Sequence, residues 1–184
     1  MTTEGPDREA LLRAREGDEE AARTLLARHG GSMMRTARAS LGRASPGEAE
    51  DVVQEAWVAA LSTEALPTGD VGAWLRAIAV RKALDARRVH ARRPETTGLL
   101  DPERDPGAGG EGSRVAVLAV REALARLAPL DRATLVLADL EGRSMAEVGR
   151  ILGSTEVAVR LRASRARRKL RRLLGDLPLE GDPA

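Results

Sequence analysis

The scarcity of aromatic residues limits what this chain can fold into. Of its 184 residues only two are aromatic, and both are Trp. Its core must therefore be filled by Leu, Val, Ala, Ile and Met, which suit packed amphipathic helices better than β-sheets, where aromatic and β-branched residues are enriched. Ala, Leu, Arg and Glu, all strong helix formers, are abundant in it. The sequence predicts an all-α protein.

Several function classes are excluded by what the sequence lacks. It has no cysteine, which excludes a disulfide scaffold, a Cys-ligated zinc site and a thiol nucleophile. The first seven residues do not form an export signal, and no run approaches the roughly 18 apolar residues of a membrane span. We therefore expect a soluble, cytoplasmic protein without membrane insertion.

An enzyme is one alternative, and the sequence argues against it. The two histidines, His29 and His90, lie far apart and outside any metal-binding spacing. No phosphate-binding loop, dinucleotide motif or nucleophile elbow is present, and carboxylates such as Glu50 and Asp51 have no histidine partner in sequence. We expect no catalytic residue, no metal and no cofactor.

Charge is concentrated near the C-terminus. Eight of the thirteen residues from Arg160 to Arg172 are Arg or Lys, and none is acidic. Basic residues that merely complement a helix dipole usually number two or three. A basic stripe of this density attracts polyanions, of which nucleic acid is the commonest in a cytoplasm.

A Pro-, Gly- and acid-rich segment at residues 92–113 has no sustained helical period and is predicted to be a flexible linker. It separates an N-terminal domain at residues 1–91 from a C-terminal domain at 114–175. Residues 176–184 are expected to form a loose tail.

The N-terminal domain is predicted to contain helices over about residues 7–16, 18–29, 33–41, 46–61 and 70–90. Asp7, Asp18 and Asp70 are expected N-caps, and Ser45 is expected to open a capping box. Gly30 to Ser32 is expected to interrupt the chain between two helices.

The C-terminal domain is predicted to contain helices from about Val115 to Ala128, Pro129 to Leu140 and Met145 to Leu152. A last helix, capped by Ser154 or Thr155, is predicted to run to Leu174. The second of them is expected to bury Leu135, Val136 and Leu140. Ser144 and Glu147 form a further capping-box pattern.

Residues 144–168 have the layout of a helix-turn-helix. Gly149 is small where two helices must approach, and Gly153 suits the sharp turn that follows. In such a motif the second helix presents its first residues to base edges and later cations to phosphates. The positions expected to face the groove are Glu156, Val157, Ala158, Arg160 and Leu161, and those expected to face the backbone are Arg162, Arg165 and Arg168. An ordinary three-helix packing unit is the alternative.

The stretch ALARLAPLDRATLVLADLEGRSMAEVGRILGSTEVAVRLRASRARRKLRRLL resembles region 4 of bacterial σ factors. Upstream, EAEDVVQEAWVAAL resembles σ region 2.2, and WLRAIAVRKALDARR resembles regions 2.3–2.4 of the extracytoplasmic-function (ECF) group. The resemblance implies a σ2-like four-helix domain and a σ4-like helix-turn-helix domain, joined by the linker.

The resemblance also implies roles for residues that periodicity alone would leave as solvated side chains. The region 2.2 helix of the family binds the clamp coiled coil of RNA polymerase, and the matching surface positions are Asp51, Gln54, Glu55 and Val58. The next helix is the family's −10 reader, for which the matching cations are Arg81, Lys82, Arg87 and Arg88. The loop at 63–69 would engage a flipped base. Trp74 could stack on a base, but its place in an apolar stripe favours core packing.

The implied partners are core RNA polymerase, through its clamp coiled coil and flap, promoter DNA and an anti-σ factor. Four positions or segments depart from the family pattern. Ser154 replaces an expected apolar residue just after the turn, and Trp57 stands where Phe or Tyr often follows the Gln-Glu pair. Val80-Arg81 stands where Arg-Asn is usual, and the recognition helix reads Ala158-Val159-Arg160-Leu161-Arg162 instead of Thr-Val-Lys-Ser-Arg. Promoter specificity is therefore open. The alternative function is a helix-turn-helix regulator that acts on duplex DNA without polymerase.

Overall fold

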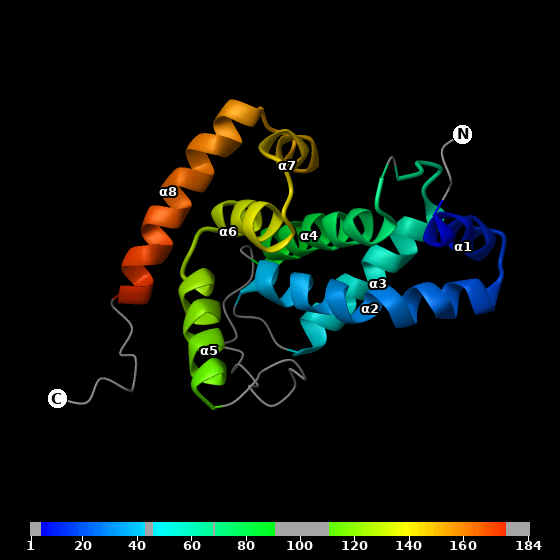
Figure 1. Ribbon diagram of the computed structural model, residues 1–184, viewed down its shortest axis with the longest axis horizontal. Helices are drawn as coiled ribbons and strands as arrows, with labels where there is room; N and C mark the ends of the chain where they lie inside the picture. The colour runs from blue at the N-terminus through cyan, green and yellow to red at the C-terminus, as the bar shows by residue number, and fades with distance from the viewer. Residues whose placement is uncertain (1–4, 43–45, 68, 91–110, 176–184) are drawn as a thin grey trace.

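The prediction of an all-α protein is confirmed. The computed structural model describes residues 5–42, 46–67, 69–90 and 111–175, and no strand occurs among them. The elements in these ranges are α1 (Pro6–Arg15), α2 (Glu19–Leu41), α3 (Pro46–Ser62), α4 (Val71–His90), α5 (Glu111–Ala125), α6 (Pro129–Leu135), a π-helical turn η2 (Val136–Leu140), α7 (Met145–Leu152) and α8 (Glu156–Gly175). Figure 1 shows their arrangement.

Helices α1 to α4 form an N-terminal module around one apolar core (Figure 1). The core is made of aliphatic side chains, as the scarcity of aromatic residues requires. Trp57 and Trp74 are only partly buried and pack against its edge. The side chains that are fully buried in this core are Leu11, Leu25, Met33, Ala37, Ala56, Ala60, Leu75, Ala79 and Ala83.

The predicted interruption at Gly30–Ser32 is wrong, because α2 runs through it without a break. Neither glycine adopts positive φ, and the Ser32 hydroxyl donates to the carbonyl oxygen of His29 at 2.8 Å. Leu25 and Met33, on either side of the segment, are fully buried in the same core. Burial of that continuous stripe outweighs the roughly 1 kcal/mol that each glycine costs a helix.

In the N-terminal module, capping follows the sequence at Asp18 and Asp70. Asp18 caps α2 by accepting hydrogen bonds from the backbone N–H groups of Glu20 and Ala21, both at 3.0 Å. Asp70 caps α4 by accepting from the N–H of Ala73 at 2.5 Å. The capping box expected at Ser45 lies outside the described residues.

The N-cap predicted at Asp7 is wrong. Helix α1 begins one residue earlier, at Pro6, whose fixed φ suits the first helical position. The Asp7 carboxylate instead contacts α2: it is ion-paired with Arg28 and lies 2.7 Å from His29 Nε2. It therefore ties the first two helices together.

Helices α5 to α8 form a C-terminal module. Helix α5 begins at Glu111, so the last residues of the predicted linker at 92–113 belong to a helix. Residues 92–110 of the predicted linker lie outside the described residues, and so does the predicted tail at 176–184. The fully or nearly fully buried core of this module includes Leu127, Ala133, Leu135, Val136, Leu137, Val148, Val159, Ala163 and Ala166.

The prediction that Leu140 is buried is wrong, although Leu135 and Val136 are buried as expected. After Leu135 the helix widens into a π-helical turn. A π turn holds more residues than an α turn, so the apolar register shifts. Leu137 then takes the inner position and is fully buried, whereas Leu140 is 61% exposed.

The two modules pack against each other through α6. This helix lies beside α2 and α4 (Figure 1). Val80 and Leu84 of α4 share one buried cluster with Ala133, Val136 and Leu137 of the C-terminal module. This apolar contact therefore joins α4, the helix for which the resemblance implies −10 reading, to the helices that support the helix-turn-helix.

Candidate nucleic-acid interface

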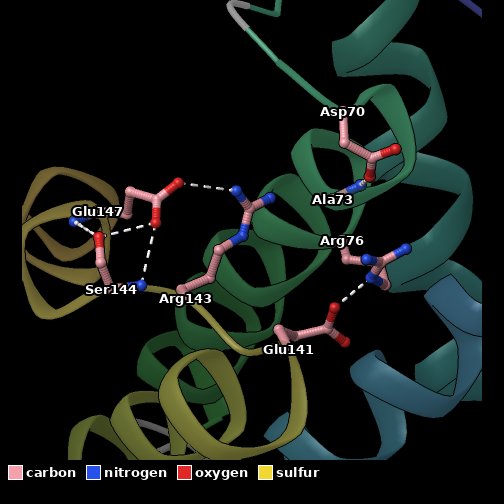
Figure 2. A network of polar contacts seen from close by, with 7 residues as sticks. All are labelled: Asp70, Ala73, Arg76, Glu141, Arg143, Ser144 and Glu147. Carbon is pink, nitrogen blue, oxygen red and sulfur yellow. Dashed lines mark hydrogen bonds and ion pairs between the residues drawn. The ribbon is translucent and has the colours of Figure 1, made fainter.

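The predicted helix-turn-helix is built by α7, α8 and the turn between them. Ser144 and Glu147 form the expected capping box: Ser144 Oγ accepts from the Glu147 N–H, and Glu147 accepts from the Ser144 N–H at 3.0 Å (Figure 2). Hydrogen bonds from Ser144, together with Arg143, lower the pKa of Glu147. The carboxylate therefore stays ionised and fixes the start of α7.

Two glycines set the angle between α7 and α8. Gly153 ends α7 in the left-handed region, with φ of 64°. A Cβ on Gly149 would lie 2.7 Å from the Ser154 carbonyl oxygen, so only glycine lets the turn approach α7 this closely. Thr155 then caps α8, because its hydroxyl accepts from the Ala158 N–H at 3.2 Å.

One face of the first two turns of α8 is open to solvent. Val157 is 70% exposed and Leu161 is 53% exposed. Glu156 and Arg160 are also exposed and form an ion pair with each other at 2.5 Å. Ala158 is partly buried. The predicted groove-facing residues therefore lie together on one open helix end, with Ala158 at its inner margin.

The arginines further along α8 divide into two groups. Arg165 and Arg168 are exposed and form no ion pair with any residue in the described ranges. Arg162, in contrast, is partly buried and lies 3.5 Å from Asp131 of α6. Arg167 donates two hydrogen bonds to Asp139, which raise its pKa. Arg162 and Arg167 hold α8 to its own module, whereas Arg165 and Arg168 are open to an anion.

The surface predicted to bind polymerase lies on α3. Its four residues, Asp51, Gln54, Glu55 and Val58, are all exposed and line one shallow groove. Val58 is 65% exposed, which is unusual for a valine in a helix that otherwise packs into a core. The structure therefore brings these four side chains together.

The cations predicted to read the −10 element do not form one cluster. Lys82 of α4 lines the α3 groove, with its Nζ 3.5 Å from Glu55. Arg81 lines a different groove, between α4 and α7. Arg88 is exposed beside Asp85, and Arg87 is partly buried. Arg81 and Arg88, seven residues apart, share a helix face, whereas Lys82 lies toward α3.

The loop before α4 is held by a residue that the sequence analysis missed. Arg15 donates to the carbonyl oxygens of Ala60 and Ala65, in each case at 2.9 Å from Nη2. Its guanidinium also lies 5.9 Å from the centroid of the Trp74 ring, within cation–π range. Trp74 is partly buried and lines the groove that contains Arg81. Arg15 is 45 residues or more from its acceptors, so no local pattern signals it.

A second group that the sequence did not indicate joins the two modules. Glu141, whose side chain is 7% exposed, is ion-paired with Arg76 of α4 (Figure 2). It also accepts a hydrogen bond from Thr36 of α2 at 2.5 Å. A separate buried cation lies in α6: Arg132 is 1% exposed, and burial lowers its pKa to about 10. This guanidinium remains charged at neutral pH.

No group of three or more His, Cys, Asp or Glu side chains that could hold a metal occurs in the described part of the chain. Among the same residues, no helix is long and apolar enough to cross a membrane. The candidate interface therefore has two parts. Helix α8 exposes arginine and aliphatic side chains, and α3 has a groove lined by both polar and apolar side chains.

Comparisons with known proteins match both modules. The family described as "Sigma-70 region 2" matches residues 25–93, and "Sigma-70, region 4" matches residues 118–170. ECF RNA polymerase sigma factor SigM of Mycobacterium tuberculosis is 36% identical over 178 residues, which cover 95% of this chain and 87% of SigM.

Solved structures agree in fold. CnrH, in complex with the cytosolic domain of CnrY, is similar with a TM-score of 0.64 and 30% identity, covering 93% of this chain and 99% of CnrH. The sigma factor RpoE of Bartonella quintana, in complex with the anti-sigma factor NepR, has a TM-score of 0.67 at 20% identity, covering 84% and 96%; that likeness shows the fold alone. Because both σ regions match in order and SigM is similar over nearly the whole length, the chain belongs to the ECF group of σ70-family RNA polymerase σ factors.

Proposed function

We propose that this σ factor directs core RNA polymerase to promoters by reading a −10 element with residues 1–91 and a −35 element with residues 114–175, which residues 92–113 connect. The observation that carries the proposal is the pairing of two surfaces in one chain. One is the helix-turn-helix with its open basic helix α8, and the other is the groove on α3.

The −35 element is assigned to the open end of α8. Glu156, Val157, Arg160 and Leu161 are exposed there, and Arg165 and Arg168 are placed to contact phosphates. Ala158 is assigned a place at the edge of this contact. Arg162 contributes mainly by holding α8 to Asp131, because the same guanidinium is partly buried in that pair.

The −10 element is assigned to α4 and the loop before it. Arg81 lines a groove that also contains Trp74 and Gly69, so a cation, an aromatic ring and a turn lie close together. A base extruded from a duplex needs stacking and phosphate contacts of this kind to offset the lost stacking energy. Arg88 extends the face of α4 on which Arg81 lies. Arg87, which is partly buried, and Lys82, which lies beside Glu55 of α3, are assigned DNA contacts at the margins of that face.

Core polymerase is assigned to the groove formed by Asp51, Gln54, Glu55 and Val58. An exposed valine among carboxylates and an amide offers an apolar contact with a polar rim, the usual build of a protein interface. The chain itself performs no covalent chemistry, since RNA synthesis belongs to the polymerase, and its place of action is the cytoplasm, with the polymerase.

Run-off transcription tests the function. Core polymerase is mixed with the chain on a pool of genomic promoter fragments, and transcripts are sequenced from their 5′ ends. Transcripts that appear only with the added chain support a σ factor. A chain that binds duplex DNA alone but never starts transcription with core polymerase would instead be the regulator considered as the alternative.

Core binding tests the α3 groove. The variant carrying Gln54→Ala with Glu55→Ala is compared with a matched control, Glu20→Ala with Thr24→Ala, which removes an exposed carboxylate and an exposed polar group from α2. The groove variant should co-purify with core polymerase less than the control does. Equal recovery of both would place the polymerase contact elsewhere.

The two solved relatives were each captured with a protein partner, which for RpoE is an anti-sigma factor. We extend the proposal to a regulatory protein of that kind for this chain. Such a protein should suppress run-off transcription when present in molar excess, and added core polymerase should restore it.

A further inference from the structure

An apolar pair lies at the open end of α8, where a basic DNA-binding helix would be expected to carry polar side chains. Val157 and Leu161 are 70% and 53% exposed, whereas every other aliphatic residue of this helix is buried or partly buried, Val159 fully. Being four residues apart, they sit one above the other on the same face. The helical core does not account for them.

The pair begins a row that ends in a free cation. At 100° per residue, positions 157, 161, 164 and 168 lie on one side of α8, opposite the buried stripe of Val159, Ala163 and Ala166. Ser164 and Arg168 of this row are exposed. Arg168 forms no ion pair with any residue that the structure places. The outer face of α8 is therefore apolar at its start and cationic further along.

That distribution matches one surface of duplex DNA. The major groove presents an apolar group, the C5-methyl of thymine, on its floor, with phosphates along its edges. Arginine is also common at protein interfaces, but eight cations and no acid among residues 160–172 match a row of phosphates, which DNA supplies. Val157 and Leu161 are about 6 Å apart along the helix axis, a distance comparable to one or two base-pair steps.

We propose that Val157 and Leu161 are specificity-determining residues that select thymines in the −35 element by contact with their C5-methyl groups. This inference rests on the proposed function, since it requires α8 to enter the major groove. It goes further by naming the chemical group that is read and the residues that read it. It also gives a physical meaning to the Leu161 departure from the family pattern.

Replacing thymine by deoxyuracil isolates the methyl group, since the O4 acceptor stays in place. The holoenzyme first selects its preferred duplexes from a random-sequence library. Each thymine in the selected −35 segment is then replaced singly by deoxyuracil. For wild type we expect about fourfold weaker binding at each contacted thymine, the value of one buried methyl.

Single substitutions in the protein test the same contacts from the protein side. Val157→Ala and Leu161→Ala should each weaken binding to the thymine duplex and abolish the difference between thymine and deoxyuracil at one position. Arg165→Gln should weaken binding to both duplexes equally and reduce its salt dependence. Val120→Ala removes an exposed valine from α5 and should change nothing.

The outcomes separate the two proposals. If selected duplexes bind equally well with deoxyuracil at every position, the methyl contact is refuted while −35 reading stands. The same holds if Val157→Ala and Leu161→Ala leave duplex binding unchanged but weaken binding to polymerase, because the pair would then be a protein contact. If the holoenzyme selects no duplex sequence at all, the proposed function fails and this inference fails with it.

Discussion

Replacing Gly149 by Ala tests how the helix-turn-helix is held. The added Cβ would lie 2.7 Å from the Ser154 carbonyl oxygen, a separation that real Cβ atoms essentially never show. That oxygen belongs to the backbone of a turn whose Ser154 N–H donates to the Gly149 carbonyl at 2.9 Å, so it cannot rotate away. Overpacking of this kind costs about 1–3 kcal/mol. A gain of up to about 1 kcal/mol in helix propensity offsets part of it.

We therefore expect Gly149→Ala to lower the free energy of unfolding by about 1–2 kcal/mol, which for a chain of this size lowers Tm by about 3–6 °C. The matched control is Gly31→Ala, inside α2, where the new Cβ would meet only an arginine side chain at 3.7 Å. The control should gain stability. Thermal unfolding followed by circular dichroism measures both variants. A Gly149→Ala protein that melts at or above the wild-type temperature would refute the close approach.

Three further predictions concern single side chains. Ser144→Ala removes the capping box of α7 and should cost about 1 kcal/mol in urea unfolding; an unchanged midpoint would contradict the cap. The pKa of Glu147 lies below its usual 4.5, so the stability it contributes is present above pH 4.5 and is lost as pH falls through the lowered value. Glu147→Gln keeps a capping-box side chain but cannot titrate, so its urea midpoint should fall less than that of wild type below pH 4.5; parallel falls would refute the shift. Arg132 is buried, and its Nε and Nη1 have no hydrogen-bond partner in the described part of the chain, so Arg132→Met should leave stability unchanged or raise it by about 1 kcal/mol. A clear loss in chemical denaturation would show that the charge stabilises the fold.

Local sequence patterns identified the parts of this fold that depend on neighbouring residues. The Ser144–Glu147 box, the turn at Gly153 and the cap at Asp18 each involve side chains within a few positions, and each is present. The exposed face of α3 was likewise visible, because a helical period separates Val52 and Ala56 from their outward neighbours.

Tertiary packing determines the features of the fold that local sequence patterns did not predict. Gly30 and Ser32 are typical of a break between two helices. Here the parts of α2 before and after them bury side chains in the same core, and the helix continues. Leu140 turns outward because of a π-helical turn, which leaves no sequence signature in a single chain. The contacts of Glu141 and Arg15 join residues far apart in sequence, so spacing could not have indicated them.

The apolar seam between α4 and α6 has a consequence for how the molecule can act. If contact with two separate promoter elements draws the modules apart, this seam parts and exposes Val80 and Leu84 to water. For fully buried side chains of this size the cost is about 1.5–3 kcal/mol each. That cost lowers the population of the DNA-competent form, and with it the apparent affinity of the free chain. In that case a surface that stabilises the separated form raises promoter affinity without touching DNA, and recognition becomes conditional on assembly.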